Sequence, residues 1–364
     1  MSQLAGQGRV GGPRSSRRLG PGLAALLLGL AALAGVPPAG AAPHRATPAG
    51  ASLALPAAAP PTLVGTGDRV MCRLPPGELD EISGMALSRR HDDVLWATND
   101  SGGGPYLYAV STVDCRVRAR LTLLDTPARD HEALATGTDA EGRDVIWIGD
   151  IGDNVGAWPY ARIHKVVEPR RLRDARVPVT TYRVRYPGGP ENAEALLAAP
   201  DREQLWIITK ESGVGSILEV PSPMSPAREP MLATRVGSAR SLVTDAAMAP
   251  NGKRYVVRDY LSAEVFDGEP PGEAQARFAL PIQPQGEAVT WTADSKRLLV
   301  ASEGSRDLVE VTVPRTALGT DGGIAGSLPR VAGFDIYPYA RVVVLAVTLV
   351  VALVALRRVF RRRR

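Results

Sequence analysis

The sequence predicts an all-β fold, a β-propeller of four-stranded blades. A short cassette recurs five times: an acidic residue opens an apolar run, and a second, strand-like run follows, in most cases with a Trp or Tyr. A polar and often acidic loop ends each second run. The cassettes repeat every 42 to 62 residues, which is the period of a propeller blade of four antiparallel strands.

Each cassette predicts an inner strand followed by a second strand. The inner strands are rich in Ala and Gly, which suits the crowded axis of a ring, and they open with Glu81, Glu132, Glu194, Asp245 and Glu287. The second strands carry Trp96, Trp147, Trp206, Tyr255 and Leu299. A second strand lies between neighbouring sheets, so we expect the three Trp side chains and Tyr255 to pack in the core without a chemical role.

The fifth cassette lacks an outer strand, and a strand over residues 70–74 can supply it. Closure by an N-terminal strand ties the ring together and removes an exposed sheet edge. The sequence therefore favours five blades. A ring of six blades remains an alternative, because the long step between the second and third cassettes, or residues 62–79, could contain another blade.

The two ends of the chain differ in composition from the propeller at 62–315. Three Arg residues precede an apolar run at 23–36, and a small-residue cleavage site follows at 39–41, so residues 1–41 are predicted to be a signal peptide. Residues 42–61 form an Ala/Pro-rich linker, and 316–335 form a Gly-rich spacer.

Residues 336–356 are predicted to be a transmembrane helix. The stretch has about the 20 residues that a bilayer requires, and Arg341 can extend to the interface. The Arg-rich tail at 357–364 is expected to stay cytoplasmic. A buried helix with a nucleic-acid-binding tail would not explain the charge-free run from Val342. We expect a single-pass protein of the cell membrane, anchored by this helix, with its N-terminal domain extracytoplasmic in the cell envelope.

The charge of the chain follows from these two ends. The whole chain carries +5, but four Arg in residues 1–41 and six Arg in 357–364 supply ten positive charges. Residues 42–356 therefore carry about −5, and no nucleic-acid partner is expected. The chain has two Cys, Cys72 and Cys115, and we expect them to form a disulfide in an oxidising compartment.

Strand direction predicts where polar side chains gather. The residues that open the inner strands and the loops that follow the second strands converge on one end of the channel. These positions carry acids, amides and a few bases, and they are the candidate site: Glu81, Asn99, Asp100, Glu132, Glu194, Lys210, Asp245, Arg258, Asp259, Glu287 and Glu303.

Converging carboxylates favour a bound cation, and oxygen ligands of this kind suit Ca²⁺. The loop Gly149-Asp-Ile-Gly-Asp-Asn154 adds Asp150, Asp153 and Asn154 as candidate metal ligands, although its spacing is not that of an EF-hand. Two alternatives remain. The acids could cap backbone amides or pair with Lys210 and Arg258, or they could contact a ligand without a metal.

The order of several motifs adds a family resemblance over residues 78–312. The motifs are Glu81-x-Ser-Gly84, Trp96-x-x-Asn-Asp-Ser-Gly102, Asp130-x-Glu132 and Gly149-Asp-x-Gly-Asp-Asn154. This order resembles bacterial exported β-propellers, which are loosely similar to phytase-like and esterase-like propellers. The resemblance implies an acidic channel mouth and, from phytase-like members, calcium ions at Asp150, Asp153 and Glu194 that hold phosphate substrates. His131 stands where an aromatic residue is expected.

The sequence predicts a membrane-anchored module that binds a ligand or protein of the envelope through an acidic, calcium-binding channel mouth. The alternative is a calcium-dependent hydrolase of phosphoester or ester bonds, and a third possibility is a structural partner of another envelope protein. No G-x-S-x-G elbow occurs, and four His are too few to favour a multi-His zinc site. Whether the protein is an enzyme stays open.

Overall fold

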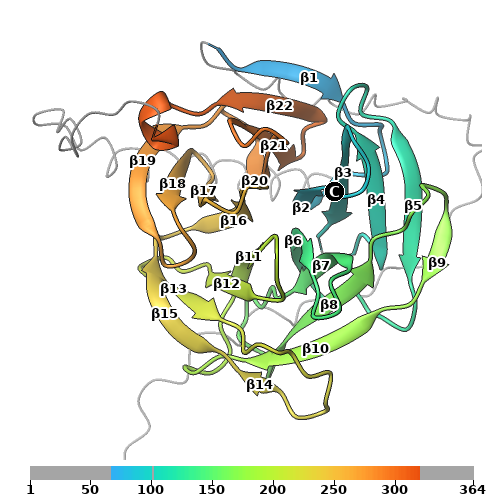
Figure 1. Cartoon of the computed structure of the whole chain (residues 1–364), viewed down its shortest axis with the longest axis vertical. Coiled ribbons are helices and arrows are strands. Elements are labelled where there is room, and N and C mark those ends of the chain that lie inside the picture. Colours follow the sequence, from blue (N-terminus) through green and yellow to red (C-terminus); the bar gives the residue numbers. More distant parts are fainter. Residues whose placement is uncertain (1–66, 101, 320–364) are drawn as a thin grey trace, which may run out of the picture. The chain divides into compact units, whose positions relative to one another are not determined.

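The structure, a computed structural model, describes residues 67–100 and 102–319. Five sheets, antiparallel except for one short edge strand in each of two of them, are arranged around one axis as the blades of a propeller (Figure 1). The innermost strands contact one another in the order β2, β6, β11, β16 and β20, and β20 returns to β2. The predicted all-β propeller of five blades is confirmed.

The strands of each blade follow one another outward from the axis. Blade 1 contains β2 (Ile82–Leu87), β3 (Val94–Asn99), β4 (Tyr106–Ser111), β5 (Val117–Leu123) and β9 (Ala175–Val177). Blade 2 contains β6 (His131–Thr138), β7 (Asp144–Asp150), β8 (Ala161–Val167), β10 (Thr180–Arg185) and β14 (Met231–Leu232). Blade 3 contains β11 (Ala193–Ala198), β12 (Leu205–Thr209), β13 (Gly215–Glu219) and β15 (Thr234–Ala239).

The last two blades complete the ring. Blade 4 contains β16 (Val243–Met248), β17 (Arg254–Asp259), β18 (Ser262–Asp267) and β19 (Glu273–Ala279). Blade 5 contains β20 (Gln285–Trp291), β21 (Arg297–Glu303), β22 (Asp307–Thr312) and, as its outer strand, β1 (Arg69–Arg73). A 3₁₀ turn, η1 (Arg315–Leu318), follows β22.

Two short strands explain the irregular spacing of the cassettes. β9 leaves blade 2 after β8, pairs in parallel with β5 of blade 1, and the chain then returns as β10. β14 does the same from blade 3, pairing in parallel with β10 of blade 2. The long step between the second and third cassettes therefore holds the β9 excursion, and the described chain has no sixth blade.

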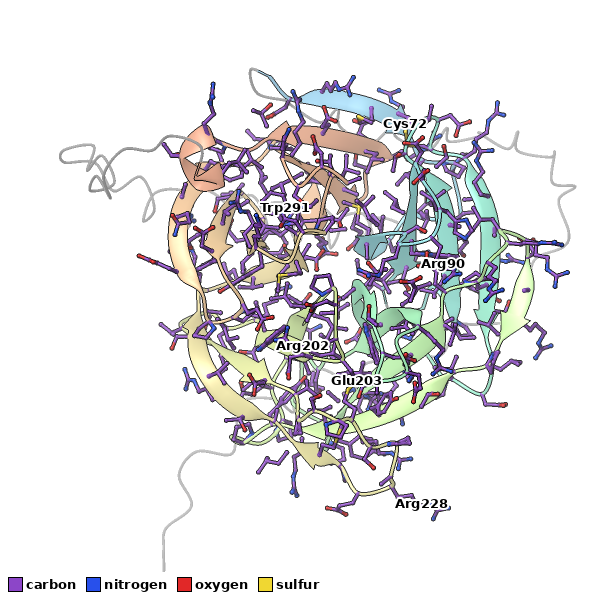
Figure 2. All side chains as sticks on the ribbon, viewed as in Figure 1. Cys72, Arg90, Arg202, Glu203, Arg228 and Trp291 are labelled. Carbon is purple, nitrogen blue, oxygen red and sulfur yellow. A yellow bond between two sulfur atoms is a disulfide. The ribbon has the colours of Figure 1, made fainter. Side chains whose placement is uncertain are left out.

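The spaces between the blades are filled by large side chains (Figure 2). Trp96, Trp147, Trp206 and Tyr255 are buried there, as is Trp291 of β20. Gly84 lies where two blades come close together, because a Cβ atom at this position would lie 2.7 Å from the backbone nitrogen of Leu134. The predicted packing role of the second-strand aromatics is thus what the structure shows.

A disulfide joins the two ends of the ring. Cys72 of β1 is bonded to Cys115, which lies in the turn between β4 and β5, and their Cα atoms are 5.6 Å apart. β1 also pairs with β22, with Arg69 opposite Glu310 and Arg73 opposite Asp307. The first described strand is therefore held by blade 5 through hydrogen bonds and by blade 1 through a covalent bond.

The ends of the inner strands differ in polarity. Where these strands finish, a cavity of about 290 Å³ is lined mainly by Ala, Met, Leu and Pro side chains, and it has no carboxylate in its lining. The acids gather where the strands begin. The axis thus has one apolar end and one acidic end.

The predicted signal peptide, linker, transmembrane helix and Arg-rich tail lie outside the described residues, as does the spacer from residue 320 onward. Across residues 67–100 and 102–319, no helix has the length and apolar character needed to cross a membrane.

Candidate functional site

A β-bulge at the start of every inner strand points one side chain toward the acidic end of the axis. In each inner strand the register with the second strand shifts by one residue at the same place. The bulged residues are Ser83, Glu132, Glu194, Thr244 and Glu287. Bulges redirect side chains in this way beside many functional sites. Blades 2, 3 and 5 therefore contribute equivalent carboxylates, and blades 1 and 4 contribute hydroxyls.

The two hydroxyls hold the neighbouring bulges in place. Ser83 Oγ donates to the carbonyl of His131 at 2.6 Å, and Thr244 Oγ1 donates to the carbonyl of Gly286 at 3.0 Å. Each of these carbonyls belongs to the residue just before a bulged Glu. The hydroxyl of one blade thus fixes the backbone that presents the carboxylate of the next.

The loops at this end form one surface. Loops that follow a second strand bond to segments that lead into an inner strand, as in Asp100 N to Glu81 O (2.9 Å) and Lys210 N to Asn192 O (2.9 Å). Gly304 N does the same with Asp80 O of the next blade, at 3.2 Å. We call this surface the acid face; its described segments are 78–81, 100, 102–105, 124–130, 151–160, 187–192, 210–214, 240–242, 260–261, 280–284 and 304–306.

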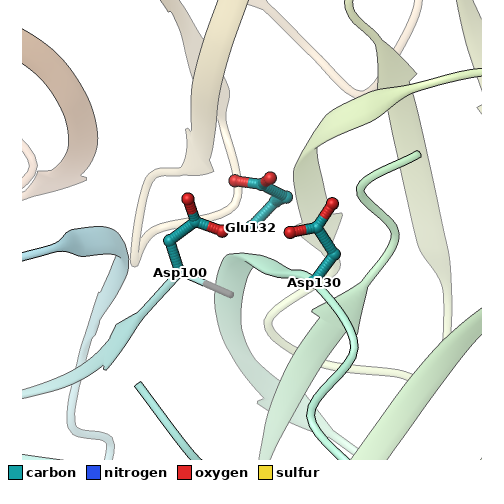
Figure 3. A group of neighbouring side chains, drawn as sticks. All are labelled: Asp100, Asp130 and Glu132. Carbon is teal, nitrogen blue, oxygen red and sulfur yellow. The ribbon is translucent and has the colours of Figure 1, made fainter. Parts of the chain in front are cut away.

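Three carboxylates come together on the acid face. Asp100 follows β3, Asp130 precedes β6 and Glu132 lies in β6, and one oxygen of each lies within 4.8 Å of the others (Figure 3). Gly152 abuts this cluster, because a Cβ atom there would overlap Asp130 Oδ2 and lie 2.7 Å from Glu132 Oε1. We call these three residues the carboxylate cluster.

The carboxylate cluster holds protons that ordinary carboxyl groups would lose. Burial, together with the hydrogen bond and charge of Asp100, raises the pKa of Asp130. Burial raises the pKa of Glu132 far more, with further contributions from Glu194 and Asp100. Glu132 also hydrogen-bonds to Glu194. Since carboxylates this close cannot all ionise, the raised pKa values favour a retained proton on Asp130 and on Glu132.

Lys210 balances part of this charge. Its Nζ lies 3.0 Å from Glu194 Oε1, and the side chain amide of Asn192 donates to the same carboxylate at 2.9 Å. Burial, the largest single cause, lowers the pKa of Lys210, but Glu194 and Tyr260 together outweigh burial and the net shift is upward. Glu194 is thus partly neutralised.

A second acidic group lies on blade 5. Gln285 Nε2 donates to Glu287 at 2.7 Å and to Glu303 at 2.5 Å. Burial is the main cause that raises the pKa of Glu287 to about 7, with Glu194 and Glu303 adding to it. The pKa of Glu303 is raised by burial and by Asp100 and Glu81. Glu81 itself is exposed.

The structure places Asp245 and Arg258 between blades 4 and 5. They face each other in the register of β16 and β17, and both are fully buried. Asp245 accepts hydrogen bonds from the backbone nitrogens of Ala246 and Val289, whereas Arg258 Nη1 donates to the carbonyls of two residues of blade 5, Ala288 and Ala301. This pair joins the two blades.

Asp259 and Asn99 are bound to nearby chain segments. Asp259 accepts from the backbone nitrogens of Leu261 and Ser262 and pairs with Arg277 at 3.0 Å, which shapes the turn between β17 and β18. Asn99 Nδ2 donates to the carbonyl of Glu78 at 2.9 Å.

The three candidate ligands of the Gly-Asp-x-Gly-Asp-Asn loop are also engaged in the fold. Asp150 accepts from Arg129 Nε (3.0 Å) and from the backbone nitrogen of Asp130 (2.8 Å). Burial opposes its charge, but His164 and Arg129 prevail and lower the pKa of Asp150 to about 2. Asp153 accepts from two backbone nitrogens of its own loop, and Asn154 Oδ1 accepts from Asn192. Asp150 thereby positions Asp130 beside Glu132.

Asp130 is the member of the carboxylate cluster that the sequence-based candidate site lacks. It lies two residues before Glu132, and residues two apart point to the same side of an extended chain. That spacing is the signal that could have added Asp130 to the candidates.

No protein-family model matches the chain, and no curated protein matches its sequence. The resemblance to exported propellers therefore stays a prediction from the motifs.

Proposed function

We propose that this chain is a membrane-anchored, extracytoplasmic binding module whose acid face binds Ca²⁺ at Asp100, Asp130 and Glu132. The observation that carries the calcium site is the carboxylate cluster itself, with three ligand atoms within 4.8 Å of one another. Carboxylate oxygens are the ligands that Ca²⁺ prefers, and several of them must surround it. The membrane anchor is supported by the apolar segment 336–356 and the Arg-rich residues after it.

The retained protons support a cation at this place. Burial raises the pKa values of Asp130 and Glu132, and neighbouring carboxylates raise them further, so their joint ionisation calls for added positive charge. A divalent cation supplies that charge and releases the protons. Glu194, held by Lys210, is then the fourth carboxylate beside the ion, and Glu287 and Glu303 remain for contacts with a ligand.

Calcium titration of the full chain in detergent tests this proposal. We expect heat on binding and a rise in melting temperature that EDTA reverses. Asp130→Asn should weaken calcium binding at least roughly tenfold, because it removes one anionic ligand. The matched control is Asp92→Asn, in the exposed turn between β2 and β3, which should bind calcium like the wild type.

The same preparation separates binding from catalysis. A melting temperature that ignores both calcium and EDTA would remove the metal from the proposal. Calcium-dependent turnover of p-nitrophenyl phosphate or p-nitrophenyl acetate that Glu132→Gln abolishes without unfolding would instead assign the hydrolase.

A further inference from the structure

The acid face also exposes large apolar side chains. Val214, Leu242, Leu261 and Ile282 lie in loops of this face on blades 3 to 5, and they are 40% to 71% exposed. Single exposed apolar residues are ordinary, but several on one functional face mark an interaction site. We call these four residues the apolar arc.

The loops that carry the apolar arc contact one another. Leu242 N donates to the carbonyl of Glu211 at 2.8 Å, which joins its loop to the loop of Val214. Lys210 lies 5.3 Å from the ring centre of Tyr260, the neighbour of Leu261. Leu280 N then donates to the carbonyl of Leu261 at 2.9 Å, next to Ile282. The arc is therefore a continuous run of loops from blade 3 to the start of blade 5.

Leu242 is held in a costly conformation. Its φ is 59°, a left-handed backbone that bulky L-residues rarely adopt. Such strain persists where the surrounding structure fixes it, often at binding sites. The exposed Leu242 side chain gains little from burial in this chain, and its backbone is strained. These two properties suit a residue that contacts a binding partner better than a residue of the core.

The loops of the arc lead to acidic groups. Ile282 is three residues before Gln285, whose amide joins Glu287 and Glu303, and the Lys210 that lies over Tyr260 is bound to Glu194. An apolar surface that borders carboxylates is complementary to a chain with apolar and basic side chains together.

We propose that the acid face docks a protein segment in which a Lys or Arg is flanked by large apolar residues. The basic side chain approaches Glu303, which Gln285 joins to the buried Glu287, and the apolar residues pack on Val214, Leu242, Leu261 and Ile282. This partner site goes beyond the calcium site and uses different side chains. A protein segment fits better than a lipid surface, because carboxylates at the centre of the face repel anionic headgroups.

Selection from a displayed library of random short peptides tests the docking site. The bait is the full chain in nanodiscs of neutral lipid with calcium present, after removal of peptides that bind empty nanodiscs. We expect enrichment of sequences with Lys or Arg beside Leu, Ile, Phe or Val. The affinity of an enriched peptide is then measured by fluorescence anisotropy.

Variants locate the bound peptide. Leu261→Ser and Ile282→Ser should each weaken it roughly tenfold, as expected for apolar contacts near the centre of an interface. Val113→Ser is the matched control, because Val113 is 67% exposed but lies in the turn between β4 and β5. The Asp130→Asn variant should still bind the peptide. Loss of the calcium site and loss of the docking site therefore give different results. The inference would be overturned by no enrichment, by an acidic consensus, or by Leu261→Ser and Ile282→Ser variants that bind the peptide as tightly as the wild type.

Discussion

At the scale of single residues, the chemistry of the acid face depends on the raised pKa values of its carboxyl groups. Asp130 and Glu132 have pKa values raised first by burial and then by neighbouring carboxyl groups. Burial also raises the pKa of Glu194, and the nearby Lys210 partly offsets this rise. The raised pKa values mark the place where burial and neighbouring carboxylates oppose ionisation.

Calcium binding should therefore release protons. Titrations at pH 6.5 in buffers of different ionisation enthalpy should give apparent binding enthalpies that differ in proportion to the protons released. Asp130→Asn should reduce both the affinity and the proton release. Identical enthalpies in every buffer would show that the cluster is already ionised before the ion binds.

Glu287 should make the calcium-free protein less stable as the pH rises. Its pKa is about 7 in the folded protein against a usual 4.5, so between these values the folded state holds a proton that the unfolded chain has lost. The stabilisation by this group is complete below about pH 4.5 and is lost as the pH rises through about 7. In EDTA, Glu287→Gln should gain stability over the wild type between pH 5 and pH 8, on the order of 2 kcal/mol.

Urea unfolding at the two pH values measures this effect. Glu273→Gln, at an exposed position of β19, provides the comparison and should show no such trend. A Glu287→Gln effect that is equal at both pH values would mean that the carboxyl titrates normally.

At the scale of strands, the bulge decides which residues form the site. A strand alternates its side chains between two faces, and one extra residue reverses the alternation. In β16 the bulged residue is Thr244, so Asp245 falls on the side that faces blade 5 and bonds to the Val289 nitrogen. In β6, β11 and β20 the bulged residue is a Glu. The five openings look alike in sequence but present different chemistry.

Strands that cross to a neighbouring blade explain the irregular cassette spacing, which allowed a sixth blade as an alternative. The connection from β8 to β10 crosses to blade 1 and adds β9 at its edge. Such additions cover the edges of outer strands, which would otherwise remain unpaired. An extra strand, like an extra blade, lengthens the repeat, so cassette spacing alone cannot separate the two.

At the scale of the whole propeller, ring closure depends on β1 and the disulfide. Replacing both cysteines with alanine should lower the free energy of unfolding by about 2–4 kcal/mol, because the cross-link restricts the unfolded chain. Urea unfolding with and without reductant measures the change. Reductant should destabilise the wild type and leave the double variant unaffected, and a wild type that ignores complete reduction would contradict a stabilising role.

The two ends of the axis differ in polarity. The apolar cavity has no carboxylate in its lining, whereas the carboxylate cluster, Glu194, Glu287 and Glu303 share the other end. The propeller provides this asymmetry because every inner strand runs in the same direction, so each blade delivers the same part of its repeat to the same end.

The sequence by itself determined the repeat, and with it a propeller of five or six blades, the buried Trp96, Trp147 and Trp206, and the end of the axis where acids collect. These follow from local periodicity and from aromatic residues that need burial. Only the tertiary structure decided which acids meet. It brought Asp130 to Asp100 and Glu132 and placed Asp245 and Arg258 between blades, because bulges and contacts between blades set side-chain direction and leave no periodic signal in the chain.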